Sequence, residues 1–288
     1  MCSPEVAKAV QDRIAREGRP ALSRRNFLKL GGAAAAGLAV AQICLTARRA
    51  AAQGSGAALP TVIDLSYVYA TNIPTYTPGE EPSRSTVVTV QDNGFYIQKW
   101  ELFEHSGTHM DFPAHFIADA ATVDNYDSSL LVGPSVVIDI KSKAAANPDA
   151  MLEVADIEAW EAANGEIPES AIVFMNSGWG QYWNDVPAFR NADADGVMHF
   201  PGFSGEAVQW LLENRNINGI GVDTLSLDPG NSATFDAHYT ILGAAKYGLE
   251  GIANLDELAA NPGALVVVGV NRWEAGSGGP GRVLALVL

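Results

Sequence analysis

The sequence predicts one α/β domain with a mixed β-sheet flanked by helices. Short runs of apolar and β-branched residues, bounded by turn residues, recur along the chain and are typical of buried strands. Segments with the apolar spacing of helices lie between them, as expected where helices pack on a sheet. No repeat and no linker rich in Pro, Gly or Ser divides residues 53–288, and the 48% hydrophobic content is enough for one core.

Residues 1–52 differ from the rest and predict a cleaved export signal. Ser23-Arg24-Arg25 is a twin-arginine pattern, followed by an Ala/Gly-rich apolar run over 30–45 and small residues at 50–52. This run is shorter than the roughly 20 residues that a membrane-spanning helix needs. We therefore expect recognition by the twin-arginine (Tat) export machinery, cleavage near Ala52, no stable membrane insertion, and a periplasmic or extracellular location.

The composition of residues 53–288 excludes several classes of function. Both cysteines, Cys2 and Cys44, lie in the leader, so the remainder has no disulfide, thiolate ligand or cysteine nucleophile. The remainder carries 9 of the 18 Lys and Arg but 30 of the 33 Asp and Glu, a formal charge of −21. Nucleic acid and anionic lipid are poor partners for such an acidic surface.

The expected elements follow in chain order. An opening strand is expected at 61–66, and strands at 85–90 and 95–103 flank Asp92-Asn93-Gly94, where Asn-Gly favours a tight hairpin turn. Ser204 is expected to cap the helix that follows it. Further strands are expected at 135–140, 171–176, 217–223, 264–270 and 282–287, and helices at 153–163, 205–215, 238–247 and 255–260.

A cluster of potential metal ligands lies between residues 105 and 115. His105, His109, Asp111 and His115 fall within eleven residues, although the chain has only five histidines. Imidazole and carboxylate ligands without thiolate suit a catalytic divalent cation. Pro113 argues against a helix, so we expect a strand end, a tight turn, and then an extended stretch with Asp111 and His115 on one side.

These residues match the pattern HxGTHxDxPxH, and the chain thereby resembles the cyclase family that includes bacterial kynurenine formamidases and isatin hydrolases. The resemblance implies the swivelling β/β/α fold of that family, a metal-dependent hydrolase domain over residues 53–288, and a homodimer or larger assembly. Weaker matches follow in the order of the family: Asp64-Leu65-Ser66, Ser177-Gly178-Trp179, Phe200-Pro201-Gly202, Gly221-Val222-Asp223-Thr224 and the segment 238–258.

The resemblance also implies roles for individual residues. His105, His109 and Asp111 would hold the principal ion, with Glu250 in or near its coordination shell. In relatives with two ions, the aspartate and glutamate are shared, and the residues matching His115 and His238 bind the second ion. In relatives with one ion, the histidine matching His115 is a free catalytic base. All six residues are present, so one or two ions, zinc or manganese, are expected. His238 and Glu250 are twelve residues apart, so both reach the site only if the helix ends between them.

The expected activity is hydrolysis of an amide, lactam, ester or lactone bond in an aromatic small molecule resembling isatin or N-formylkynurenine. A metal-activated water would attack the acyl carbon, His115 or Glu250 would take its proton, and His238 would protonate the leaving group. Phe112, Phe116, Trp179 and Trp183 are candidates for an aromatic substrate pocket.

Two alternatives stay open. The first is an exported metal-binding or accessory protein without turnover. The second is a cyclase or lyase in which the metal promotes ring closure or elimination.

Overall fold

The structure is a computed structural model that describes residues 15–16 and 59–288. The predicted export signal and its cleavage site lie outside the described residues, apart from Ala15 and Arg16. Residues 84–100 separate from the rest as a small unit, and residues 60–83 and 101–288 form a larger unit. Within the described part of the chain, no helix is both long enough and apolar enough to cross a membrane.

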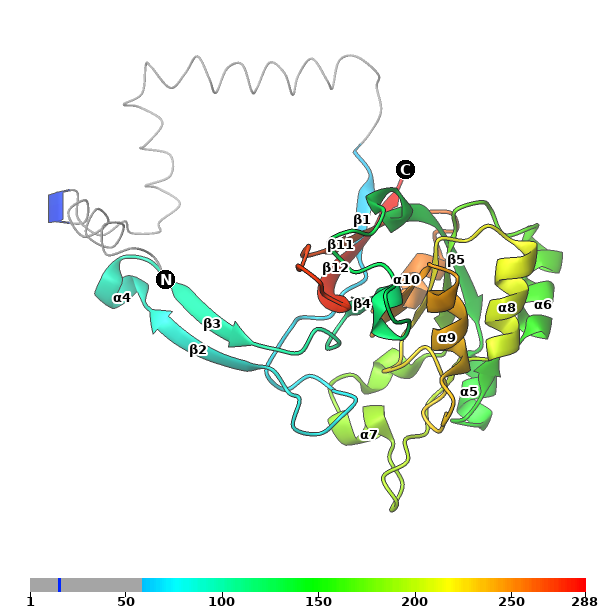
Figure 1. Cartoon of the computed structure of the whole chain (residues 1–288), viewed down its shortest axis with the longest axis horizontal. Helices are drawn as coiled ribbons and strands as arrows, with labels where there is room; N and C mark the ends of the chain where they lie inside the picture. The colour runs from blue at the N-terminus through cyan, green and yellow to red at the C-terminus, as the bar shows by residue number, and fades with distance from the viewer. Residues whose placement is uncertain (1–14, 17–58) are drawn as a thin grey trace, which may run out of the picture. The chain divides into compact units, whose positions relative to one another are not determined.

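The larger unit is built on an eight-stranded mixed sheet (Figure 1). The strand order is β1-β12-β11-β5-β7-β9-β10-β4, and β12 also pairs with β4, which closes the sheet into a barrel. Neighbours from β5 to β10 run parallel, and the other pairs run antiparallel. The strands are β1 (Thr61–Asp64), β4 (His109–Asp111), β5 (Val132–Asp139), β7 (Ile172–Asn176), β9 (Gly219–Val222), β10 (Tyr247–Glu250), β11 (Leu265–Val270) and β12 (Gly278–Val287).

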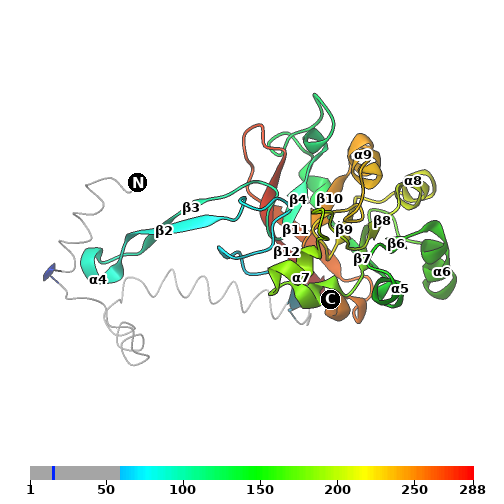
Figure 2. The same cartoon turned by 90° about the horizontal axis from the view of Figure 1, so that it is seen from below.

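A layer of helices packs on one face of this sheet (Figure 2). Ile157, Leu211 and Ile241, one from each of three helices, lie in the same apolar core cluster as strand residues of β5, β7 and β9. Ser204 caps α8 as expected, because its hydroxyl accepts a hydrogen bond from the Ala207 amide at 3.1 Å. The helices are α5 (Lys141–Ala146), α6 (Val154–Asn164), α7 (Val186–Arg190), α8 (Gly205–Asn214), α9 (Asp236–Gly243) and α10 (Leu255–Ala259).

The short elements complete the larger unit. A second, two-stranded sheet pairs β6 with β8 in parallel. These elements are β6 (Met151–Leu152), β8 (Gly202–Phe203) and the 3-10 turns η2 (Pro113–His115), η3 (Ser128–Leu131) and η4 (Trp179–Tyr182). The predicted mixed α/β fold is confirmed, and its closure into a barrel is a finding of the structure.

The small unit consists of a strand pair and a short helix. β2 (Ser83–Val88) pairs with β3 (Ile97–Glu101), as expected. The predicted tight turn is wrong, because α4 (Val90–Asn93) lies between the strands. Thr89 caps this helix by accepting from the Asp92 amide, and Gly94 ends it at φ 82°.

Two predictions around the site are also corrected. The helix expected to reach residue 247 ends at Gly243, and the chain then enters β10. The stretch after Asp111 is not extended, since Pro113–His115 forms a 3-10 turn in which the Phe112 carbonyl accepts from the His115 amide at 2.9 Å. Pro113 stands at the start of that turn, where its missing N–H is tolerated.

Candidate metal centre

Strand β4 carries two of the predicted ligands and fixes a third opposite them. His109 and Asp111 are two residues apart, so both point to one side of β4, and Met110 points to the other side into the core. Glu250 of β10 is the register partner of His109. Directly opposed residues of an antiparallel pair share a face, so Glu250 joins the two ligands of β4.

The first ligand cluster consists of His105, His109 and Asp111. The His105 Nδ1 atom lies 2.6 Å from Asp111 Oδ1, and His109 Nε2 lies 3.4 Å from the same oxygen. His105 precedes β4 on a loop that turns at Gly107, which has φ 69°. A Cβ atom at Gly107 would also lie only 2.9 Å from the Tyr69 ring, so glycine serves both the turn and the close approach.

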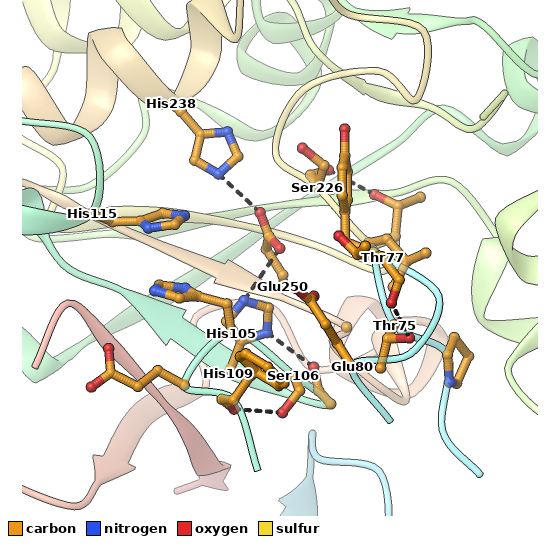
Figure 3. A pocket seen from close by; sticks show the side chains of 18 of the residues that line it. Thr75, Thr77, Glu80, His105, Ser106, His109, His115, Ser226, His238 and Glu250 are labelled. Carbon is orange, nitrogen blue, oxygen red and sulfur yellow. Dashed lines mark hydrogen bonds and ion pairs between the residues drawn. The ribbon is translucent and has the colours of Figure 1, made fainter. Parts of the chain in front are cut away.

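The second cluster shares Asp111 with the first and adds His238 and Glu250. The His238 Nε2 atom lies 3.1 Å from Glu250 Oε1 and 3.5 Å from Asp111 Oδ2. Glu250 also lies 3.3 Å from His109 Nε2 through its other oxygen. Figure 3 shows His105, His109, His238 and Glu250 converging on one cavity from different elements.

Hydrogen bonds to the outer ring nitrogens orient two of the histidines. The Nδ1 atom of His109 lies 3.1 Å from the Gly107 carbonyl, and Nδ1 of His238 lies 2.6 Å from Asp228 Oδ2. Asp228 in turn accepts from the backbone amides of Ala237 and His238 at 2.7 and 3.1 Å. Because carbonyl and carboxylate oxygens only accept, both rings carry a proton on Nδ1, which leaves Nε2 as the atom that would bind a metal.

The donor set fits a divalent cation. Asp111 is completely buried, and its Oδ2 atom has no hydrogen-bond partner among the residues that the structure describes. Burial and the nearby charge of Asp111 raise the pKa of Glu250, whereas imidazole contacts outweigh burial and hold the pKa of Asp111 well below its usual value. Buried carboxylate oxygens without donors are costly, and a cation bound by imidazole and carboxylate ligands removes that cost.

His115 is placed beside the two clusters and belongs to neither of them. Its ring stacks on His105 with centroids 3.6 Å apart, and it makes no hydrogen bond to the described residues. Burial lowers the pKa of His115 to about 4. The ring is therefore neutral near pH 7 and has a free nitrogen that can accept a proton.

A cavity of about 610 Å³ opens over the ligands. His105, His109, His115, His238 and Glu250 line it, and no Lys or Arg is among the described residues that line it. The aromatic part of the wall comes from several irregular segments and includes Tyr76, Phe103, Phe116 and Phe235.

Of the four predicted pocket residues, only Phe116 lines this cavity. Phe112 alternates with Asp111 along the chain and is buried in the core against Tyr126, with ring centroids 5.0 Å apart. Trp179 and Trp183 pack in a separate apolar cluster, and Trp183 lines another cavity of about 210 Å³.

Two cavity-wall residues, Tyr76 and Phe235, and the residue that orients His238, Asp228, could not be predicted, because no local sequence pattern marks them. Tyr76 and Phe235 occupy irregular segments, and Phe235 has the unusual φ of 54°. Asp228 lies ten residues before the histidine that it orients. The position of Phe112, by contrast, could have been found from the alternation of side chains in an extended segment.

A closed α/β sheet that carries two metal-ligand clusters beside a cavity is the arrangement expected of a metal-dependent hydrolase. The family described as "Putative cyclase" matches residues 63–229. The chain belongs to this family, as its sequence resemblance implied.

Known proteins agree with this assignment. The curated isatin hydrolase of Roseibium aggregatum is 37% identical over 205 residues, which cover 68% of this chain and 77% of that protein. The kynurenine formamidase of Erythrobacter litoralis is 27% identical over 162 residues, or 56% of this chain and 64% of that protein. The solved isatin hydrolase A from Labrenzia aggregata, bound to benzyl benzoate, matches with a TM-score of 0.74 and 34% identity, covering 84% of this chain and 98% of that one.

Proposed function

We propose that this protein hydrolyses the amide or lactam bond of an uncharged aromatic small molecule, with isatin as the reference substrate. One observation carries the proposal: Asp111 joins two ligand clusters whose other members line one cavity, and this cavity also has aromatic walls. The similarity to an isatin hydrolase over most of the chain supports the same reaction class.

The residues divide into binding and proton-transfer roles. A bound divalent cation would supply an activated water and polarise the acyl carbonyl. His105, His109, Asp111, His238 and Glu250 would hold it, with Asp111 shared if two ions bind. The His115 ring is neutral and makes no hydrogen bond to the described residues, so it is placed to accept the proton of the attacking water, with Glu250 as the alternative.

The charge of the cavity favours an uncharged substrate. Glu80 and Glu104 line it together with the carboxylate ligand Glu250, and no basic residue in the described part of the lining offsets them. A bound divalent cation would offset the ligand carboxylates, so Glu80 and Glu104 are the charges that disfavour a substrate carboxylate such as that of N-formylkynurenine. The same charges also favour release of the carboxylate product that lactam hydrolysis generates.

A substrate panel tests the reaction. Metal-loaded protein would be assayed with isatin, N-formylkynurenine, an aryl formamide and an aryl lactone, with His109→Ala as the inactive control. We expect turnover of isatin to exceed that of N-formylkynurenine. Metal binding without turnover of any substrate would favour the accessory protein, and ring closure or elimination products would favour the cyclase or lyase.

We propose zinc or manganese as the metal. Imidazole and carboxylate ligands without thiolate accommodate both ions. Elemental mass spectrometry of protein purified from its native host distinguishes them and gives the number of ions per chain. Less than one bound ion per chain, with activity retained, would contradict the metal-dependent mechanism.

We also propose export by the Tat machinery to the periplasm or cell exterior, on the strength of Arg24-Arg25 and the apolar run that follows. Replacing both arginines by lysine should retain the protein in the cytoplasm, which cell fractionation would detect. A homodimer or larger assembly is proposed from the family resemblance, and light scattering of the purified protein tests it; a monomer would contradict this proposal.

A further inference from the structure

Among the three histidine ligands, His105 differs most in its exposure and in the partner of the ring nitrogen that points away from the metal centre. It lies on the loop before β4, and its side chain is 24% exposed, against 7% for His109 and 5% for His238. Its Nδ1 atom, rather than Nε2, faces Asp111 at 2.6 Å. Its Nε2 atom lies 2.9 Å from the hydroxyl of Ser277.

Ser277 is also bound to the side chain next to His105 in the sequence. Glu104 Oε2 accepts from the Ser277 hydroxyl at 2.8 Å and from the Ser277 amide at 3.0 Å. The Ser277 carbonyl accepts from the Phe112 amide at 2.9 Å, which holds Ser277 against the chain just after β4. The serine is therefore fixed by backbone contacts as well as by its own side chain.

Glu104, Ser277 and His105 form a hydrogen-bonded relay, and the number of protons available determines which atom donates in each bond. A carboxylate only accepts, so the single hydroxyl proton of Ser277 goes to Glu104. The Ser277 oxygen must then accept from His105, which places a proton on Nε2. Asp111 also only accepts, so without a metal the Nδ1 atom carries a proton as well. A metal bound at Nδ1 would replace that second proton, while Nε2 keeps the proton that it donates to Ser277.

Gly278, the residue after Ser277, leaves space for the His105 ring. A Cβ atom at Gly278 would lie 2.4 Å from His105 Cε1. That separation is too short for any side chain, so the chain beside Ser277 approaches the imidazole only because glycine occupies position 278.

We propose that Glu104 and Ser277 act as positioning residues that fix the ring orientation and tautomer of His105, so that it binds the metal through Nδ1. His109 and His238 bind through Nε2. The inference rests on the proposed metal site but requires no particular substrate.

Metal affinity of the metal-free protein tests this inference. Ser277→Ala and Glu104→Ala should each weaken binding of Zn(II) or Mn(II) about 10- to 100-fold, the usual effect of removing a partner of a ligating histidine. The double variant should bind no more weakly than the weaker single variant, because both act through one relay. Ser277→Thr keeps the hydroxyl and should restore most of the affinity.

Glu274→Ala is the matched control, because Glu274 is exposed on the same loop and lies outside the relay. This variant should bind metal like the wild type. Thermal unfolding of the metal-free variants checks that each one folds. Wild-type affinity in Ser277→Ala, or effects of the two single changes that add, would overturn the relay. If the wild-type protein itself binds no metal, the proposed function fails instead.

Histidine ¹⁵N spectra of the Zn(II) form supply a readout that a purely structural role would not change. We expect His105 to be metal-bound at Nδ1 with its proton on Nε2, and His109 and His238 to show the reverse. A proton on Nδ1 of His105 would contradict the inference whatever the affinities are.

Discussion

The two ligand clusters share Asp111 but are assembled in different ways. His105, His109 and Asp111 come from one stretch of seven residues, whereas His238 and Glu250 reach Asp111 from α9 and β10. The outer nitrogen of His238 meets a buried carboxylate, while His109 meets a backbone carbonyl and His105 a serine hydroxyl. In the local cluster (His105, His109 and Asp111) the histidines contact neutral groups directly, and the charge of Glu104 acts only through Ser277. In the long-range cluster (Asp111, His238 and Glu250) the histidine contacts the charge of Asp228 directly.

This difference in hydrogen-bond partners predicts how rigid each cluster is and how strongly substitutions nearby affect it. Hydrogen bonds to a charged group are about twice as strong as neutral ones, so Asp228 restrains its histidine more firmly than Ser277 does. We expect the long-range cluster to be the more rigid one, and the local cluster to respond more to changes on the loop before β4.

Removing Asp111 should have the largest effect, since it belongs to both clusters. Asp111→Asn should lower metal affinity and turnover at least about a thousandfold, because a lost ligand costs several kcal/mol and each 1.4 kcal/mol is tenfold. Calorimetric titration with the metal measures the loss. Asp119→Asn, at an exposed position with φ 59°, is the control and should behave like the wild type. Metal retained by Asp111→Asn would show that the clusters do not depend on a shared ligand.

Removing the carboxylate behind His238 tests the long-range cluster alone. In Asp228→Asn, the amide can donate to His238 Nδ1 and turn the Nε2 lone pair into an N–H, so metal affinity should fall about 10- to 100-fold. The loss should exceed that of Ser277→Ala, and competition with a chelator compares the two. Asp236→Asn, exposed at the start of the same helix, is the control. A smaller loss than that of Ser277→Ala would reverse the ranking of the clusters.

The pH dependence of metal binding gives the smallest effect. Burial opposes protonation of His109, but Asp111 and Glu250 raise its pKa to about 9 in the metal-free protein. Below that pH the metal must displace a proton from His109, so the contribution of His109 should raise affinity by up to about tenfold per pH unit and level off near pH 9. Nearby carboxylates also raise the pKa of His238, so its proton adds to the same trend. The proton on His109 stabilises the metal-free fold fully below pH 6.5, and this contribution is lost between 6.5 and 9.

Calorimetry in buffers of different ionisation enthalpy counts the released protons. Release of at least one proton per metal at pH 7 is expected, and none would contradict the raised pKa of His109.

The same contrast explains what the sequence could predict. The first cluster was found from spacing alone, because its ligands are neighbours in the chain. His238 and Glu250 were found only through the family resemblance, since a helix end, a turn and a strand separate them. The predicted helix over 238–247 failed at its end, where pairing of Tyr247–Glu250 between two strands outweighs helical preference.

The aromatic pocket was predicted poorly for a related reason. Phe112, Trp179 and Trp183 lie near motif segments in the sequence, but each side chain is buried in an apolar cluster away from the cavity. The walls of the cavity come instead from segments such as the one containing Tyr76, where no periodicity indicates which way a side chain points.

The pairing of β12 with β4 also orders the assembly of the site during synthesis. β4 is synthesised before β12, which is one of its two neighbours in the sheet. Ser277, which contacts His105, directly precedes β12. The nascent chain can present His105 and His109 long before their supports emerge from the ribosome. The complete support of the centre therefore forms only after β12 has been translated, although all its ligands precede that strand in the chain.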